Sequence, residues 1–208
     1  IYTLSLHDAL PIFHRAIDDG ERIAVFGDYD VDGVTATALL YTYLDSAGAD
    51  VYYKLPSRDD DGYGLSETAV DLMAAKGVSL IVTVDNGVSA NAAIAHAKEQ
   101  GVDVVVTDHH LPPQTLPEAA AIVNPQLPGD ESPCKTLSGA GVAFKLAAAL
   151  DGCTPDEMLP FYGDLAAIGT IADIMLLEGE NRRIVKAGLA LLQQTERPGI
   201  AALIEACG

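Results

Sequence analysis

The chain has 208 residues, 49% hydrophobic and 20% charged, which is enough to bury a core, and no apolar run approaches the ~18 residues of a membrane span. Its three cysteines are unevenly spaced, which argues against a disulfide framework or a thiolate zinc site and for a protein of the reducing cytoplasm with no membrane partner. The net charge of −18 is unusual for a nucleic-acid binder, so either the substrate is not a polyanion or metal ions and a further domain supply positive charge.

The first dozen residues do not lead into the rest of the sequence. Residues 1–12 (IYTLSLHDALPI) show neither helical nor strand periodicity, and they resemble translated adaptor sequence from the ends of assembled environmental reads. We therefore expect this segment to be non-native or disordered, with a native N-terminal arm as the alternative. Its His7 and Asp8 are accordingly not counted as candidates for a functional site.

From residue 21 onward, short apolar runs alternate with helical patterns. Strands are predicted at Arg22–Phe26, 51–55, 80–84, 102–107 and, as a short fifth one, Ala121–Val123. Helices are predicted at 34–47, at 69–76 behind a Ser66 N-cap, and at 90–100. This alternation predicts an α/β fold with a mostly parallel sheet of about five strands flanked by helices.

The pattern becomes helical beyond residue 129. Helices are predicted at Gly139–Leu150, 160–172 and 182–194, and a last amphipathic stretch at 200–206 has no cap. We therefore assign residues 13–195 to one catalytic domain with a helical C-terminal part. Residues 196–208 would begin a truncated linker to a domain that is missing from this sequence.

Alternating carboxylates follow the first predicted strand. Asp28, Asp30 and Asp32 stand at the strand end, where open α/β sheets build their sites. Like charges so close repel one another, and hard divalent cations would compensate them. The alternatives are a solvated acidic turn and a calcium loop of EF-hand type. The calcium loop would need a preceding helix and a glutamate six residues after Gly33, where Leu39 stands.

Further candidate ligands stand at the ends of other predicted elements. They are Asp85 after the strand 80–84, the triplet Asp108, His109 and His110 after the strand 102–107, and Asp173 in an apolar helix end. Taken alone, Asp85 could be an N-cap and Asp173 an exposed helix-end residue. Taken together, carboxylates and imidazoles without a thiolate favour two Mn²⁺ or Mg²⁺ ions. Two such ions about 3.5–4 Å apart form a clamp for displacement at phosphorus.

The order of these groups resembles the four motifs of the DHH superfamily. The motifs correspond to DYDVDG at residues 28–33, Asp85, the DHH triplet at 108–110, and Asp173. The segments GDYDVDGVTATALL (27–40), SGAGVAFKLAAAL (138–150) and GTIADIMLLEGENR (169–182) are similar to RecJ-type single-stranded-DNA exonucleases within that superfamily. The resemblance runs from about residue 13 to the end, with a departure at 175–177, where the family usually has a proline.

The resemblance implies two metal ions that share one carboxylate. One ion would be held by Asp28, Asp30 and Asp85, and the other by Asp32, Asp85, His109 and Asp173, with Asp85 bridging.

Four other residues receive roles from the same resemblance. Asp108 would orient a histidine, and His110 would contact the scissile phosphate while water activated by the two cations attacks it. Asn181 and Arg182 are candidates for contact with the substrate or with another domain. A plain position on a helix surface is the alternative for both.

The function implied by the resemblance is 5′→3′ exonuclease hydrolysis of single-stranded DNA in DNA repair and recombination. The implied partners are single-stranded DNA, single-strand-binding protein and a RecQ-type helicase. Family members continue into a second, DHH-associated domain, so we expect this chain alone to be weakly active.

Two alternative functions remain. Other DHH phosphodiesterases act on short oligonucleotides or cyclic dinucleotides, or are inorganic pyrophosphatases, but they usually carry a histidine just ahead of the first motif, where Val25, Phe26 and Gly27 stand. A non-catalytic RecJ-like scaffold of a replication complex, as in the eukaryotic replicative helicase, would have lost metal ligands that this chain keeps.

Overall fold

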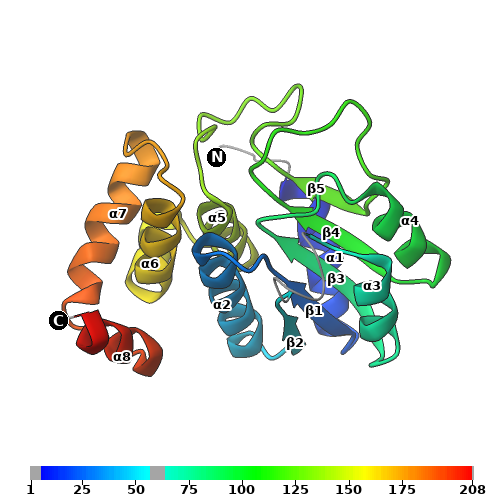
Figure 1. The fold of residues 1–208 in the computed structure, drawn as a ribbon, viewed down its shortest axis with the longest axis horizontal. Helices are drawn as coiled ribbons and strands as arrows, with labels where there is room; N and C mark the ends of the chain where they lie inside the picture. Colours follow the sequence, from blue (N-terminus) through cyan, green and yellow to red (C-terminus); the bar gives the residue numbers. More distant parts are fainter. Residues whose placement is uncertain (1–5, 57–63, 208) are drawn as a thin grey trace.

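A parallel β-sheet organises the protein in the computed structural model, which describes residues 6–56 and 64–207 (Figure 1). The strands are β1 (Arg22–Phe26), β2 (Asp50–Lys54), β3 (Val78–Val84), β4 (Asp103–Thr107) and β5 (Ala121–Val123). Their order is β2-β1-β3-β4-β5, and each neighbouring pair is parallel. The predicted α/β fold with a mostly parallel sheet is confirmed.

Helices cover both faces of this sheet. On one face lie α1 (Leu6–Asp18), α2 (Val31–Ser46) and α5 (Gly139–Leu150), and on the other lie α3 (Glu67–Ala74) and α4 (Asn91–Glu99). A further layer follows on the first side: α6 (Pro155–Ala172) packs against α2 and α5, and α7 (Gly179–Leu192) packs against α6.

The residues of β1 show why both faces need cover. Ile23 and Val25 belong to the core cluster under α1, α2 and α5, whereas Ala24 and Phe26 belong to the cluster under α3 and α4. Successive side chains on a strand point to opposite faces, so a strand covered on both sides is apolar throughout. Replacing the fully buried Phe26 with alanine would lower the free energy of unfolding by about 3–5 kcal/mol.

The expectation that residues 1–12 stay outside the fold is wrong for the part that the structure describes. Helix α1 begins at Leu6, and Leu6 and Ala9 lie in the same core cluster as Phe13 and Ala16. Their spacing of three and four residues is that of an apolar helix stripe. The stripe was missed because the resemblance of these residues to adaptor sequence removed them from the fold prediction. Residues 1–5 lie outside the described residues, and the non-native origin of the segment stays a prediction.

Three helices begin earlier than the sequence predicted, and in α2 and α6 a capping side chain further upstream explains the difference. Helix α6 begins at Pro155 rather than at residue 160, since Thr154 and Glu157 form a capping box and Pro160 is accommodated inside the helix. Helix α2 begins at Val31 behind the N-cap Asp30, and α7 begins at residue 179 rather than 182. No helix in the described ranges combines the length and the hydropathy of a membrane span.

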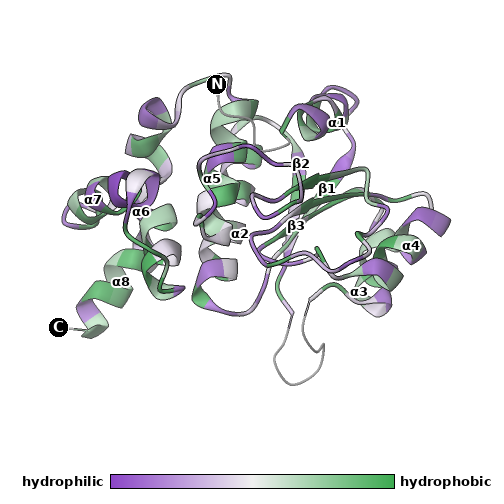
Figure 2. Ribbon diagram, turned by 90° about the horizontal axis from the view of Figure 1, so that it is seen from above, coloured by the Kyte–Doolittle hydropathy of each residue, from purple (hydrophilic) through white to green (hydrophobic). Residues whose placement is uncertain are grey.

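The last helix, α8 (Pro198–Cys207), buries none of its residues and is largely hydrophobic in colour (Figure 2). The turn that precedes it is held by Arg197. Its Nε donates to Asp164 Oδ2 at 2.7 Å, and its Nη2 donates to the Phe161 carbonyl at 2.6 Å. Because Asp164 is buried, this ion pair fixes the start of α8 against α6.

The strand order changes direction between β1 and β3. The chain leaves β1 for α2 on one face of the sheet and leaves β3 for helix α4 on the other face. In open parallel sheets the loops diverge at such a point and leave a crevice at the carboxyl ends of the strands. Asp28 and Asp85 follow these two strand ends, so the fold places both at the crevice.

Candidate metal centre

The backbone of the site is an extension of the sheet. The amide of Asp85 donates to the Thr107 carbonyl at 3.1 Å, and the amide of Asp108 donates to the Val123 carbonyl at 3.0 Å. Asp85 has a φ of +62°, a left-handed conformation that aspartate adopts more readily than most residues. The strand ends therefore hold these two carboxylates at fixed positions.

The candidate ligands converge into groups that meet at Asp85. The ligand atoms of Asp28, Asp30 and Asp85 lie within 4.8 Å of one another, and so do those of Asp32, His109 and Asp173. His109 Nε2 lies 3.0 Å from Asp85 Oδ1, 3.8 Å from Asp32 Oδ2 and 3.7 Å from Asp173 Oδ2. These distances agree with two ligand sets that share Asp85, and the metal-binding roles themselves remain a proposal.

The N-terminus of α5 holds Asp32 in place. The amide of Gly139 donates to Asp32 Oδ2 at 2.6 Å, and the amide of Ala140 donates to Oδ1 at 2.9 Å. A helix N-terminus stabilises a negative charge through such unpaired amides. The start of α5 also lies against Asp85. This approach requires glycine at position 139, because a Cβ there would lie 2.5 Å from the Cβ of Asp85.

The sequence predicted the helix Gly139–Leu150 correctly, but it did not predict that the N-terminus of this helix holds Asp32. The signal was present in the sequence, because Ser138 followed by Gly139 is an N-cap with a small first residue. In the structure the Ser138 side chain accepts a hydrogen bond from the Gly141 amide, as an N-cap does.

The first acidic loop has two different carboxylates. Asp28 is buried, whereas Asp30 is exposed and its Oδ1 accepts the Gly33 amide at 2.8 Å as the N-cap of α2. Gly33 also lies against Asp28, since a Cβ on Gly33 would be 2.6 Å from the backbone nitrogen of Asp28. Asp30 therefore combines a capping role with a position next to the other ligands.

Without a cation, burial destabilises the ionised form of the carboxylates in this centre. It raises the pKa of Asp28 and of Asp32, and it raises that of Asp85 to about 7, with the Asp32 charge acting in the same direction and His109 against it. Oδ1 of Asp28 and Oδ1 of Asp85 are buried and accept no hydrogen bond, although Nε2 of His109 lies 3.0 Å from Oδ1 of Asp85. Unpartnered buried carboxylate oxygens fit hard divalent cations as ligands.

The two adjacent histidines face different partners, as expected. The half-buried His109 points to the ligand cluster, while His110 is exposed and its Nδ1 lies 2.7 Å from Asp108 Oδ1. Asp108 thus orients the side chain of His110 rather than that of the candidate ligand His109, to which it offers only a backbone contact. A His110 nitrogen also lies within 4.8 Å of ligand atoms of Asp85 and His109.

Asp108 and His110 form a charged pair. The hydrogen bond to Asp108 raises the pKa of His110 to about 9. Burial works to raise the pKa of Asp108, but the hydrogen bonds from His110 and from the Val88 amide outweigh burial and lower it. At neutral pH, His110 is therefore a cation at the edge of an acidic site, and its Nε2 is free of Asp108.

Asp173 reaches the cluster because α6 ends there. It is the C-cap of α6 and half-buried. Asn181, a candidate for substrate contact, is instead buried: its Nδ2 donates to the carbonyls of Thr136 at 2.6 Å and Leu176 at 3.0 Å. This burial contradicts a plain position of Asn181 on the helix surface, while its contact with the substrate or with another domain stays a prediction. Arg182 is exposed, and its contact with substrate stays a prediction.

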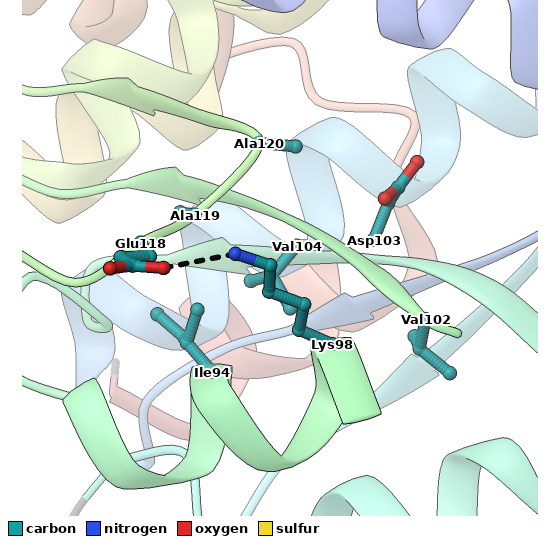
Figure 3. Close-up of a pocket in the computed structure, with 8 residues that line it drawn as sticks. All are labelled: Ile94, Lys98, Val102, Asp103, Val104, Glu118, Ala119 and Ala120. Carbon is teal, nitrogen blue, oxygen red and sulfur yellow. Dashed lines mark hydrogen bonds and ion pairs between the residues drawn. The ribbon is translucent and has the colours of Figure 1, made fainter. Parts of the chain in front are cut away.

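A shallow hollow of about 200 Å³ lies away from these residues, between α4 and β4 (Figure 3). Across it, Lys98 Nζ forms an ion pair with Glu118 Oε2 at 2.9 Å. Both side chains are exposed, and a surface ion pair of this kind contributes little stability. The hollow brings no group of candidate ligands together among the described residues, so we do not connect it with the chemistry of the centre.

Residues 22–170 match the DHH family, N-terminal domain. The chain belongs to the DHH family. The matched span contains all the strands of the described sheet and every candidate ligand except Asp173, which lies just beyond its end.

Similar proteins support this membership. The chain is 45% identical over 213 residues to the single-stranded-DNA-specific exonuclease RecJ of Salmonella typhimurium, covering 96% of this chain and 37% of that protein. It is 46% identical over 203 residues to the RecJ of Bacillus subtilis, covering 98% of this chain and 25% of that protein. This DHH chain therefore spans much less than two thirds of the length of these relatives.

Solved structures of similar proteins share this fold, and two of them contain manganese. A crystal structure of exonuclease RecJ bound to manganese is 42% identical, with a TM-score of 0.88, covering 98% of this chain and 52% of that one. RecJ of Thermus thermophilus in complex with Mn²⁺ is 39% identical, with a TM-score of 0.83, covering 100% of this chain and 31% of that one. The fold of this DHH chain is thus similar to the folds of relatives that were solved with bound manganese.

Proposed function

We propose that this chain carries the catalytic centre of a RecJ-type exonuclease, which hydrolyses phosphodiester bonds of single-stranded DNA with two divalent metal ions. The observation that carries the proposal is the place of Asp85 beside two groups of ligand atoms, each group within 4.8 Å. Relatives named single-stranded-DNA-specific exonucleases support the substrate, and relatives solved with Mn²⁺ or Mg²⁺ support the ions.

The proposed division of the ligands is the one that the resemblance of the sequence implies, and the distances between the ligand atoms support it. The first ion would be held by Asp28, Asp30 and Asp85, and the second by Asp32, Asp85, His109 and Asp173. When bound, the ions would supply Lewis acidity toward a phosphate and toward water, and they would neutralise the crowded carboxylates.

His110 would bind the phosphate that is cleaved. Asp108 holds Nδ1 of the ring, which leaves Nε2 to donate to a phosphate oxygen. In the metal-free protein the hydrogen bond to Asp108 raises the pKa of His110 to about 9, so Asp108 favours the protonated ring. The protonated ring would therefore place a fixed positive charge where negative charge develops in the transition state, a form of catalysis that needs no rearrangement during the reaction.

The finer parts of the proposal rest on the resemblance of the sequence to RecJ-type exonucleases. We infer 5′→3′ polarity, a role in DNA repair and recombination in the cytoplasm, and single-strand-binding protein and a RecQ-type helicase as partners. We also assign residues 13–195 to the catalytic domain, extended to Leu6 because α1 packs in its core, and 196–208 to the start of a linker toward a DHH-associated domain. The greater length of the relatives supports this assignment, and we expect weak turnover by the 208-residue chain alone.

Titration calorimetry with Mn²⁺ tests the metal centre. We expect the wild type to bind two ions and Asp85→Ala to lose most of this binding, because Asp85 belongs to both ligand sets. Asp71→Ala is the matched control, since Asp71 is an exposed carboxylate on α3 that pairs with His96. Binding that is indifferent to Asp85 would overturn the shared centre.

A panel of substrates tests the reaction. We expect hydrolysis of 5′-labelled single-stranded DNA to exceed that of a dinucleotide, a cyclic dinucleotide and pyrophosphate. Preference for one of the small substrates would support another DHH phosphodiesterase or a pyrophosphatase. Metal binding without turnover of any of them, in this chain and in a longer one, would support the scaffold alternative.

A further inference from the structure

Ile174 has an unfavourable backbone conformation directly after the candidate ligand Asp173. Within the described ranges, positive φ values at non-glycine residues occur at Asp85 (+62°) and at Ile174 (+57°). The amide of Ile174 donates to the Ile171 carbonyl at 3.1 Å, and that of Met175 donates to the Thr170 carbonyl at 3.2 Å. These are the bonds of a Schellman motif, whose left-handed position is usually a glycine. A β-branched residue there is a true outlier.

Packing within the fold does not compensate for this strain. The Ile174 side chain is 89% exposed, more than any other large hydrophobic residue in the described part of the chain. No packing contact of the side chain offsets the strained backbone conformation of Ile174, which indicates that the isoleucine is kept for a function rather than for stability. Glycine would have ended α6 with less strain, so we ask what the isoleucine side chain contacts.

Other exposed apolar side chains stand next to the ligand-bearing segments. We call six of them the apolar rim, namely Val31, Val34, Leu111, Ile171, Ile174 and Leu176. Val31 follows Asp30, Leu111 follows His110, and Ile174 follows Asp173. Asp30, His110 and Asp173 belong to the groups of candidate ligands, so Val31, Leu111 and Ile174 each lie one residue from the centre.

The charge of the chain restricts what this rim could bind. With 30 acidic and 12 basic residues, the protein repels phosphates wherever cations do not neutralise it. Away from the metal centre, a nucleic acid would therefore be held better through its uncharged bases and sugars than through its backbone. Aliphatic side chains contact the faces of bases only when the bases are unstacked, as they are in a single strand.

We propose that the apolar rim binds the unstacked bases and sugars of the nucleotides next to the cleaved phosphate, with Ile174 as the central contact. This inference rests on the proposed function and adds to it a reason for preferring single strands, since paired and stacked bases would not expose their faces to the rim. It also explains how an acidic surface holds a polyanion beyond the two ions.

Two matched strands test the inference. One is a phosphorothioate oligothymidylate, which resists hydrolysis, and the other is its abasic analogue with the same number of charges. With Mn²⁺ present, we expect the wild type to bind the base-bearing strand more tightly, by roughly tenfold for one isoleucine-sized contact. Ile174→Gly should lose this difference, while its binding of Mn²⁺ and of the abasic strand stays unchanged.

The same variant should be more stable than the wild type, because glycine adopts the left-handed conformation without strain. A loss of base-dependent binding together with a higher unfolding midpoint would exclude simple damage to the fold. Ile174→Leu should keep most of the preference for bases, and Leu72→Ala, which truncates an exposed side chain on the distant α3, should keep all of it.

The outcomes separate this inference from the proposed function. Equal binding of both strands by the wild type would contradict base binding by the apolar rim and would not affect the proposal for the metal centre. The apolar rim would then be a surface for another protein segment. An unchanged preference in Ile174→Gly would also contradict base binding by the rim. Failure of the wild type to bind either strand in a longer chain as well would overturn the proposed function itself.

Discussion

Oδ1 of Asp85 lies 3.0 Å from Nε2 of His109, although the two residues follow different strands. Burial raises the pKa of Asp85 to about 7. Burial works to lower the pKa of His109, but the closeness and charge of Asp85 outweigh it and raise that pKa. Without a cation the pair therefore retains protons that metal binding would displace.

The metal-free protein should lose stability as pH rises. In the unfolded chain Asp85 ionises near its ordinary value of 3.8, whereas in the folded chain it stays protonated to about 7, so the folded state binds the extra proton between these values. The free energy of unfolding should fall across that range. The raised pKa of His110 should extend the fall to about pH 9. Urea denaturation in a chelator at several pH values measures this.

Asp85→Asn provides the control for that pH dependence. In this variant the free energy of unfolding should change little between about pH 4 and pH 7, and it should still decrease at higher pH because of His110. With Mn²⁺ the dependence should reverse in the wild type, because the metal binds only the deprotonated ligands. A metal-free stability that does not change with pH would contradict the buried, protonated Asp85.

Asp108→Asn should shift the pH profile of hydrolysis. Without the Asp108 carboxylate, His110 loses the hydrogen bond that raises its pKa to about 9, so the ring is neutral at a lower pH. The loss of activity on the alkaline side should therefore move to lower pH. His110→Ala should lower kcat by about 100- to 1000-fold, a typical loss for a transition-state donor. Single-turnover assays on labelled single-stranded DNA measure both effects.

These two variants also distinguish phosphate contact from metal binding. If His110 acts only toward the phosphate, Mn²⁺ affinity should be nearly the same in the wild type, His110→Ala and Asp108→Asn. A large loss of Mn²⁺ binding in His110→Ala would instead make His110 a metal ligand, as its position near Asp85 and His109 would permit.

Gly139→Ala should damage the centre although it adds only a methyl group. That methyl group would lie 2.5 Å from the Cβ of Asp85, so Asp85 or the start of α5 must move. We expect a loss of about 1–3 kcal/mol in the free energy of unfolding and a clear loss of Mn²⁺ affinity. Gly163→Ala in α6 is the control, because its new methyl group would meet only side-chain carbons at 3.3 Å or more. Wild-type metal binding in Gly139→Ala would contradict the close approach.

Asn181→Ala and Arg182→Ala should have opposite signatures. Removing the buried Asn181 amide breaks its hydrogen bonds to the carbonyls of Thr136 and Leu176, and at about 0.5–1.5 kcal/mol for each bond this should cost about 1–3 kcal/mol of unfolding free energy. Arg182 is exposed, so Arg182→Ala should leave stability unchanged and weaken strand binding if Arg182 contacts substrate. Thermal denaturation and strand-binding titrations separate the two. An equally stable Asn181→Ala would contradict the structural role.

Much of the centre could be predicted from the sequence because its residues follow strands. The apolar runs at β1, β3 and β4 mark the strand ends, and the carboxyl ends of parallel strands meet at one edge of a sheet. Asp28, Asp85 and the residues 108–110 could therefore be expected at one site from the sequence pattern alone. The stripe of α1 was missed because the resemblance of residues 1–12 to adaptor sequence removed them from the fold prediction.

The sequence by itself determined the α/β class, the strands and the identity of the ligand-type side chains, because periodicity and residue type are local properties. Only the tertiary structure decided that β1 lies beside β3, that α5 directs its amides at Asp32, that Asp108 holds His110, and that Asn181 is buried. These are contacts between segments far apart in the chain. They depend on strand order and helix packing, which no local pattern encodes.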